Sequence, residues 1–347
     1  MIKKHFGTLP DGRQVDLFSL TNSKGMEVNI TNYGATLTSI FLPTSKGKVD
    51  VIWGFDTLEG CLSDHPFMNT IIGRYGNRIA QASFRLDGKT YDLPANQAPH
   101  QLHGGSEGFD KKLWKAADIS DEEGNKLKLT YLSPDGEMGF PGKLKAELIY
   151  ALNDENELSL SYRAETDQPT IVNLTHHGYF NLSGKGDIKA HKMSLYCDKI
   201  VAAGEDGIPL QNALMEVEGT PFDFRKPASL GERLEQEHEQ LTFGNGFDRS
   251  FVANDWKGEL KLIAEVSDPE TGNRMKVKTT EPAVQLYTAN FLSNVKGKYG
   301  QVYEPYSAFC LEAQHFPDSP NRPDFPSTRL DKGEVYLQTT IYQFFWD

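Results

Sequence analysis

The sequence predicts an all-β protein folded as a large β-sandwich. Apolar and polar residues alternate in the segments Leu127–Tyr131, Leu158–Tyr162 and Met275–Lys278, and this period of two is typical of strands with one buried face. Turn-forming residues, such as Asp87-Gly88 and the cluster Asp268–Asn273, separate segments of this kind, as they do in antiparallel sheets. Helical periodicity is scarce, and many short strands joined by turns favour two packed sheets.

Two short segments are exceptions to the strand pattern. Ser229 to Leu241 carries leucines among charged residues, and its first residues, Ser-Leu-Gly-Glu, match a capping box. A shorter helix is expected at Leu58 to Leu62. Pro317 to Pro326 is proline-rich and is expected to form an ordered loop. Because neither an internal repeat nor a linker-like stretch interrupts the chain, we expect residues 1–347 to form one domain.

Charge and cysteine content narrow the classes of partner. The chain has 36 Lys and Arg against 48 Asp and Glu, a net charge of −12, which disfavours binding to nucleic-acid phosphates or to an anionic membrane surface. No run approaches the roughly 18 apolar residues of a membrane helix, and no signal-peptide pattern follows Met1. Cys61, Cys197 and Cys310 form neither a disulfide framework nor a zinc motif. We therefore expect a cytoplasmic protein.

The motifs of several large enzyme classes are absent. Without Gly-x-Gly-x-x-Gly after a strand, a dinucleotide-dependent epimerase or dehydrogenase is disfavoured, and neither a Walker loop nor a Gly-x-Ser-x-Gly elbow is present.

The candidates for a functional site are a series of loops rich in His, Gly, Asn and acidic residues. Gly73–Ile79 sets two arginines among glycines, which suits either a ligand with vicinal hydroxyl groups or a surface turn. Gln101–Gly105 sets His103 before two glycines that allow close approach of a ligand, although a single histidine is more often structural.

Further candidates lie nearer the C-terminus. Asn173–Asn181 contains His176 and His177, which would point to opposite faces of a strand, so only one can face a shared pocket. Asp248 lies beside glycines and is either a turn residue or a ligand contact. Glu312 lies in an apolar run, where a carboxylate costs free energy unless it is paired or functional. Such surroundings can also shift its pKa into a catalytic range.

His103, His177 and Glu312 raise the possibility of a metal site with two histidines and one carboxylate. The residue types permit it. The spacing does not support it, because the sequence has no His-x-His or His-x-x-x-His pair among them. We expect neither a metal ion nor a cofactor.

Taken together and in order, these loops resemble the aldose 1-epimerases, the galactose mutarotases. No single motif is decisive, but the ordered set covers nearly the whole chain. The matching segments are Asn32–Thr36, Gly73–Ala80, Gln101–Gly105, Gly108–Lys111, Gly139–Gly142, Asn173–Leu182, Gly219–Arg225, Gly246–Asp248, Gln285–Tyr287, Leu311–Glu312 and Thr339–Tyr342.

The resemblance implies a single large β-sandwich of the mutarotase type with a cofactor-free sugar cleft. By position it implies that Glu312 is the catalytic base and His177 the acid. The sugar-binding positions that it implies are Asn77, Arg78, His103, Tyr179, Asp248 and Gln285. The chain departs from the family pattern at His176, where Asn or Gly is usual, but the spacing His-x-Tyr-Phe-Asn favours His177 as the acid.

The implied activity is interconversion of the α- and β-anomers of D-galactose- and D-glucose-type hexoses. A base removes the proton on O1, an acid protonates the ring oxygen O5, and the opened aldehyde turns before the ring closes again. We expect an ionised Glu312 and a protonated His177 that keep each other charged. Two alternatives on the same fold are a hexose-6-phosphate 1-epimerase, which needs a basic phosphate subsite, and a non-catalytic carbohydrate-binding protein. We expect a monomer or homodimer whose partner is a small aldose sugar.

Overall fold

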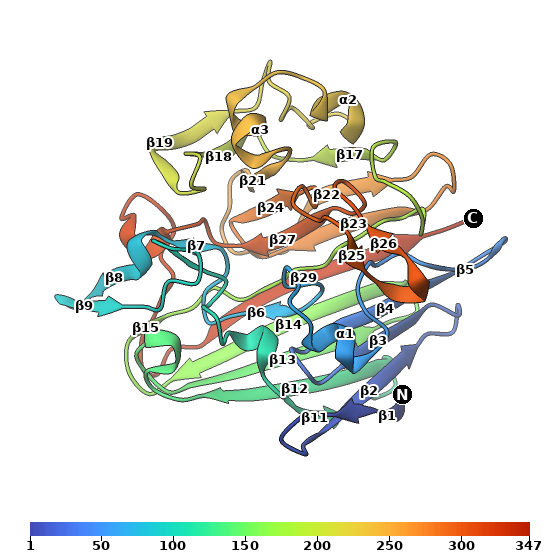
Figure 1. The fold of residues 1–347 in the computed structure, drawn as a ribbon, viewed down its shortest axis with the longest axis horizontal. Helices are drawn as coiled ribbons and strands as arrows, with labels where there is room; N and C mark the ends of the chain where they lie inside the picture. The colour runs from blue at the N-terminus through green and yellow to red at the C-terminus, as the bar shows by residue number, and fades with distance from the viewer.

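Nine antiparallel strands form the largest sheet in the computed structural model, which describes residues 1–347. Their order is β11 (Lys115–Asp118), β12 (Asn125–Ser133), β13 (Leu144–Leu152), β14 (Glu157–Thr166), β29 (Tyr336–Phe345), β23 (Arg274–Thr279), β22 (Lys261–Ser267), β17 (Lys192–Leu195) and β20 (Ala228–Ser229). Figure 1 shows the green strands β12 to β14 and the red β29 running along the length of the molecule. The predicted alternation at Leu127–Tyr131, Leu158–Tyr162 and Met275–Lys278 is confirmed, since these segments lie in β12, β14 and β23 with every second residue buried, apart from the half-buried Tyr131.

Two five-stranded sheets share one core with this large sheet. The first is a meander of β1 (Ile2–Thr8), β2 (Gln14–Thr21), β3 (Glu27–Thr31), β4 (Leu37–Thr44) and β5 (Gly47–Asp50). The second has the order β19 (Pro209–Glu216), β18 (Lys199–Ala203), β21 (Asp248–Val252), β24 (Ala283–Tyr287) and β27 (Cys310–Gln314). A cluster of 53 buried apolar residues takes side chains from all three sheets, for example Val28, Leu148 and Leu286. The predicted β-sandwich is confirmed.

Pairs of short strands connect the sheets and carry several of the candidate loops. They are β6 (Ile71–Ile72) with β16 (Thr175–His176), β7 (Arg78–Ile79) with β10 (Gln101–Leu102), β8 (Ser83–Leu86) with β9 (Lys89–Asp92), β15 (Thr170–Ile171) with β28 (Arg329–Leu330) and β25 (Val295–Lys296) with β26 (Val302–Tyr303). Because β7 pairs with β10 and β6 with β16, loops far apart in sequence become neighbours in space.

The helices are few and short, and one predicted helix is wrong in its middle. Instead of a single helix from Ser229 to Leu241, the chain forms α2 (Leu230–Leu234) and α3 (Glu239–Gly244). The predicted cap is present, since the Ser229 hydroxyl accepts a hydrogen bond from the N–H of Glu232. A second start signal interrupts the helix, because the His238 side chain accepts from the N–H of Gln240 and begins α3.

Two other expectations concern a helix and a loop. The predicted helix α1 (Leu58–Leu62) is confirmed, and the Thr57 hydroxyl caps it by accepting from Gly60 N–H. Pro317 to Pro326 is a loop with one 3-10 turn at Ser319–Asn321. This loop is attached to the body of the protein, since the N–H of Asp318 donates to the Arg78 carbonyl at 2.8 Å.

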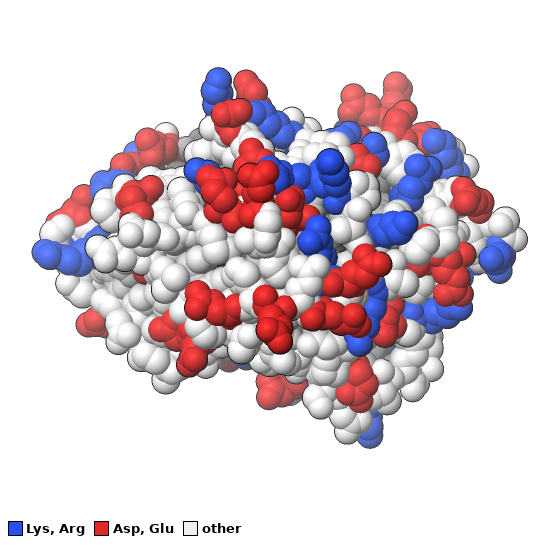
Figure 2. All heavy atoms as spheres, turned by 90° about the horizontal axis from the view of Figure 1, so that it is seen from above, with Lys and Arg blue, Asp and Glu red and all other residues white.

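Acidic and basic side chains interleave on the surface. On the face drawn in Figure 2 they alternate without a broad basic area, in keeping with the net charge of −12. None of the helices combines the length and the apolar character needed to cross a bilayer.

Candidate active site

Three candidate side chains meet on the sheet that contains β21, β24 and β27. Gln285 on β24 lies directly opposite Glu312 on β27, so the two side chains share one face of the sheet. Asp248 begins β21 on the other side of β24, and Gln285 Nε2 donates to Asp248 Oδ1 at 2.6 Å. Strand pairing thus brings together polar groups that are far apart in sequence.

The short strand β16 brings His177 to the same place. The N–H of His177 donates to the Thr70 carbonyl at 3.1 Å, and its own carbonyl accepts from the N–H of Asn69 at 2.9 Å. These bonds fix the backbone, and His177 Nε2 then lies 3.7 Å from Glu312 Oε1. The two side chains are only 6% and 2% exposed, so they face each other with little access to water.

His176 points in the other direction, as the alternation along a strand predicts. Its Nδ1 lies 3.4 Å from the Tyr342 hydroxyl, and its ring packs edge-on against Phe180 and Tyr342. Of the two adjacent histidines, His177 is therefore the one that faces the Glu312 carboxyl group.

His103 completes a triad with His177 and Glu312, and one nitrogen or oxygen atom of each lies within 4.8 Å of the others. The backbone N–H of Asn77 donates to His103 Nδ1 at 3.1 Å. Because Nδ1 accepts a hydrogen bond, the neutral ring carries its proton on Nε2. That nitrogen suits donation to a hydroxyl oxygen. It does not offer the lone pair that a metal ion needs, so the triad would have to change tautomer to hold one.

Arg78 lies at the rim of this cluster and is half-buried. Its Nε donates to Gln97 Oε1 at 2.8 Å, and its two terminal nitrogens have no protein partner. Asn77, the residue before it, acts through its backbone on His103 and accepts the N–H of Arg78 on its own side-chain oxygen. The guanidinium group is thus held in place with donors to spare.

Aromatic rings enclose the imidazoles. Tyr179 stacks on His177 with ring centroids 5.1 Å apart and planes 15° apart, and Tyr287 meets His177 edge-on at 6.2 Å. The Tyr179 hydroxyl already donates to the Pro66 carbonyl at 2.9 Å. This arrangement suits positioning of His177 better than the sugar contact that the resemblance implies for Tyr179.

Sequence reasoning did not single out Phe67 or Tyr287. The signal for Tyr287 was present, since it lies two residues after Gln285 and so faces the same side of β24. The Phe67 ring lies 4.7 Å from the ring of His103 and 6.3 Å from that of His177. Its backbone has a φ of 56°, a left-handed conformation that a bulky residue rarely adopts, and no local pattern predicts it.

Burial acts on the charges of both members of the pair. It raises the pKa of Glu312 well above its ordinary value; the charge of Asp248 adds to this effect and that of Arg78 opposes it. Burial also lowers the pKa of His177 to about 3. Burial thus acts against the expected ion pair in the free protein, because a charge without hydration is disfavoured on either group. Glu312 Oε2 has no hydrogen-bond partner in the protein.

A surface hollow of about 750 Å³ lies beside the triad. Its lining includes Phe67, which contacts both imidazoles, Gln97, which holds Arg78, and Leu102, which precedes His103. None of the candidate side chains lines this hollow, which lies next to their cluster. The His177 and Glu312 side chains are more deeply buried than an open sugar cleft would leave them.

Comparison with known proteins gives one consistent picture. The family model described as aldose 1-epimerase matches residues 16–343. The chain is 43% identical to the galactose mutarotase of Rattus norvegicus over 344 residues, covering 98% of this chain and 97% of that protein. It is 37% identical to the aldose 1-epimerase of Escherichia coli strain K12 over 339 residues, covering 96% of each chain.

Solved structures show the same fold. The galactose 1-epimerase from Lactobacillus acidophilus NCFM superposes with a TM-score of 0.88 at 27% identity, covering 99% of this chain and 98% of that one. A GalM/aldose epimerase homologue from C. elegans superposes with a TM-score of 0.87 at 27% identity, covering 95% of this chain and 98% of that one.

Proposed function

The chain belongs to the aldose 1-epimerase family, and we propose that it interconverts the α- and β-anomers of D-galactose, D-glucose and similar free aldoses. The observation that carries the proposal is the buried pair, with Glu312 Oε1 and His177 Nε2 at 3.7 Å. The two oxygens on an anomeric carbon lie about 2.3 Å apart, so one group can reach O1 while the other reaches O5. A carbohydrate-binding protein without catalysis would need no such pair.

We propose that the pair works with a single exchangeable proton. Burial keeps this proton on Glu312 in the free protein, since it disfavours charge on both groups. When a sugar hydroxyl group bridges the pair, the proton moves to His177, and the carboxylate is stabilised by the hydroxyl donors of the sugar and by the charge of Arg78. Glu312 then takes the O1 proton while His177 protonates O5. The ring opens, and it closes on the other face with the two roles reversed.

The remaining polar side chains would hold the sugar. His103 Nε2 and the free guanidinium nitrogens of Arg78 are donors, whereas Asp248 is an acceptor fixed by Gln285. Holding several hydroxyl groups at once aligns the anomeric centre with the acid and the base. No step needs a cofactor, because the bonds that break and form are those to protons and the C1–O5 bond.

We further propose a single cytoplasmic domain. The alignments to relatives run over nearly the whole chain, which supports one catalytic unit. All three cysteines are free and buried, as expected in a reducing compartment. Asn173-Leu174-Thr175 and Asn181-Leu182-Ser183 match the N-glycosylation acceptor pattern. Both asparagine side chains are buried and hydrogen-bonded in the folded protein, so neither can accept a glycan there, in keeping with an unglycosylated protein.

Polarimetry tests the proposal directly. Purified protein is added to freshly dissolved α-D-galactose, α-D-glucose and α-D-glucose 6-phosphate, and the initial change in rotation is corrected for spontaneous mutarotation. We expect acceleration with the two free sugars. Preference for the phosphorylated sugar would favour the hexose-6-phosphate 1-epimerase, and binding without acceleration of any sugar would overturn the assignment to an enzyme.

A further inference from the structure

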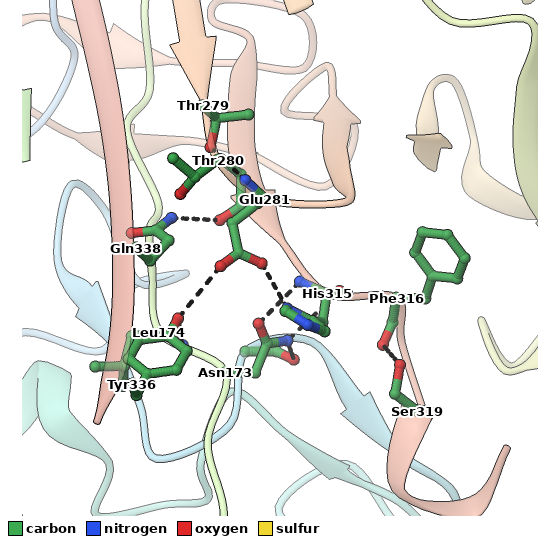
Figure 3. Close-up of polar contacts among 12 residues, drawn as sticks. Asn173, Leu174, Thr279, Thr280, Glu281, His315, Phe316, Ser319, Tyr336 and Gln338 are labelled. Atoms are coloured by element: carbon green, nitrogen blue, oxygen red, sulfur yellow. Dashed lines mark hydrogen bonds and ion pairs between the residues drawn. The ribbon is translucent and has the colours of Figure 1, made fainter. Parts of the chain in front are cut away.

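A second buried acid–imidazole pair lies at the ends of the strands that carry Gln285 and Glu312. Glu281 comes two residues before β24, and His315 directly follows β27. Glu281 Oε2 accepts a hydrogen bond from His315 Nδ1 at 2.6 Å, with side chains that are 3% and 12% exposed (Figure 3). The pair therefore closes the end of the β24–β27 ladder.

The same pair is bonded to the segment that leads to the acid. The N–H of His315 donates to Asn173 Oδ1 at 3.0 Å. The Tyr336 hydroxyl accepts from the N–H of Leu174 at 3.2 Å and lies 3.5 Å from Glu281 Oε1. Figure 3 shows Asn173, Leu174 and Tyr336 gathered around the Glu281 carboxyl group and the His315 ring. Residues 173 and 174 run directly into β16 and His177, so the cluster joins the strand of the base to the strand of the acid.

We propose that Glu281 and His315 form a positioning pair that sets the separation between Glu312 and His177. The inference rests on the proposed function, since it assigns to Glu312 and His177 the proton transfers of that reaction. The pair does not touch the reacting atoms. His315 is three residues beyond Glu312, about 10 Å along a strand, and it acts through the backbone of β27.

The chemistry of the pair supports positioning rather than stability alone. Burying a polar pair costs free energy that a well-packed apolar pair would not cost. In return, a short hydrogen bond fixes the distance and direction between two side chains more narrowly than apolar packing does. A misplacement of about 1 Å can cost up to about 10²-fold in rate, so a narrow constraint at this joint is useful for proton transfer.

The placement also predicts which kinetic constant responds. Asp248 and Gln285 lie on the same sheet as Glu312 and would move with it, so much of the sugar contact survives when the joint loosens. His177 directly follows β16, which pairs with β6 in a different sheet, and its alignment with the base is what changes. Loss of the pair should therefore lower kcat with little effect on KM.

The test compares two substitutions of His315 by polarimetry with α-D-galactose. His315→Leu removes the donor, and we expect kcat to fall about tenfold with KM within about twofold of the wild-type value. His315→Asn places its amide nitrogen where Nδ1 was, keeps the bond to Glu281, and should retain at least about half of kcat. Rescue by Asn is a result that a general loss of stability would not give.

A matched control is available in the buried pair of Lys298 and Asp50, whose Nζ–Oδ2 distance is also 2.6 Å with side chains 1% and 9% exposed. Asp50→Asn should lower the melting temperature and leave kcat of the folded protein unchanged. If His315→Leu does not fold, Glu281→Gln replaces it, with an expected several-fold loss of kcat at unchanged KM.

Three results would overturn the positioning role. They are wild-type kcat in His315→Leu (or in Glu281→Gln where that replaces it), equal losses in His315→Leu and His315→Asn, or an equal loss of kcat in Asp50→Asn. Failure of the proposed function is distinguishable, because the wild-type protein itself would then not accelerate mutarotation.

Discussion

Substituting each of the two adjacent histidines should have very different effects on catalysis, although both rings are buried. His177→Asn removes the imidazole that faces Glu312 at 3.7 Å. If that ring protonates O5, kcat should fall by about 10²–10⁴, the usual contribution of a positioned acid, which corresponds to about 3–5 kcal/mol of transition-state stabilisation. The melting temperature should also fall by a few degrees, because the change removes the ring contacts with Tyr179 and Tyr287, so kcat is the readout that separates the two variants.

His176→Asn should affect stability without a comparable loss of kcat. The change removes ring contacts with Phe180 and Tyr342 and leaves space in the core, at a cost of about 1–3 kcal/mol. An unfolding entropy of about 2.1 cal/mol/K per residue gives about 0.7 kcal/mol/K for a chain of 347 residues. The melting temperature should therefore fall by about 1–4 °C, while kcat stays within about tenfold of the wild-type value.

The assay measures initial rotation of fresh α-D-galactose at matched pH and buffer, with thermal melting of the same samples. Glu312→Gln should resemble His177→Asn, and the double variant should lose far less than the product of the two effects, because the pair transfers protons as a unit. If His176→Asn abolishes activity while His177→Asn keeps most of it, the assignment of His177 as the acid is wrong.

Three further predictions concern protons and metals. Because the pKa of His177 is lowered to about 3 and that of Glu312 is raised, the pair should keep its single proton and kcat should stay flat between about pH 4 and pH 5, where an ordinary glutamate titrates; a loss in that range would contradict this. Activity should survive EDTA, and a loss restored by one divalent ion would revive the metal site. Burial raises the pKa of Asp110 from 3.8 to about 7. The free energy of unfolding is therefore highest below pH 3.8. It should fall by about 4 kcal/mol as the pH rises towards 7, at about 1.36 kcal/mol per pKa unit. Asp110→Asn should then raise the melting temperature at pH 8 but not at pH 4, and equal shifts at both would refute the linkage.

Much of the fold follows from local pattern. Alternation along β12 and β14 predicts strands with one buried face because a strand repeats every two residues. The single helix predicted over Ser229–Leu241 was wrong because a capping signal at His238 lies inside the same apolar pattern. The order of the loops predicts which residues belong to one site. The position of Phe67 depends on its left-handed backbone, and that of Glu281 depends on where β24 begins; no local sequence pattern shows either.

The burial of the pair is the property that the sequence did not reveal, and it acts against the ion pair that we expected. Two opposite charges stabilise each other at a partly hydrated site, but at 2% and 6% exposure the loss of hydration disfavours charge on both groups, and that exposure arises only when the segments that follow β16 and form β27 meet. A neutral pair is nevertheless well suited to this reaction. Mutarotation neither consumes nor releases a proton, so a pair that shares one proton returns to its starting state after each turnover and needs no exchange with solvent. Deep burial therefore does not obstruct turnover, and it strengthens the interactions of the charges that form while the sugar is bound.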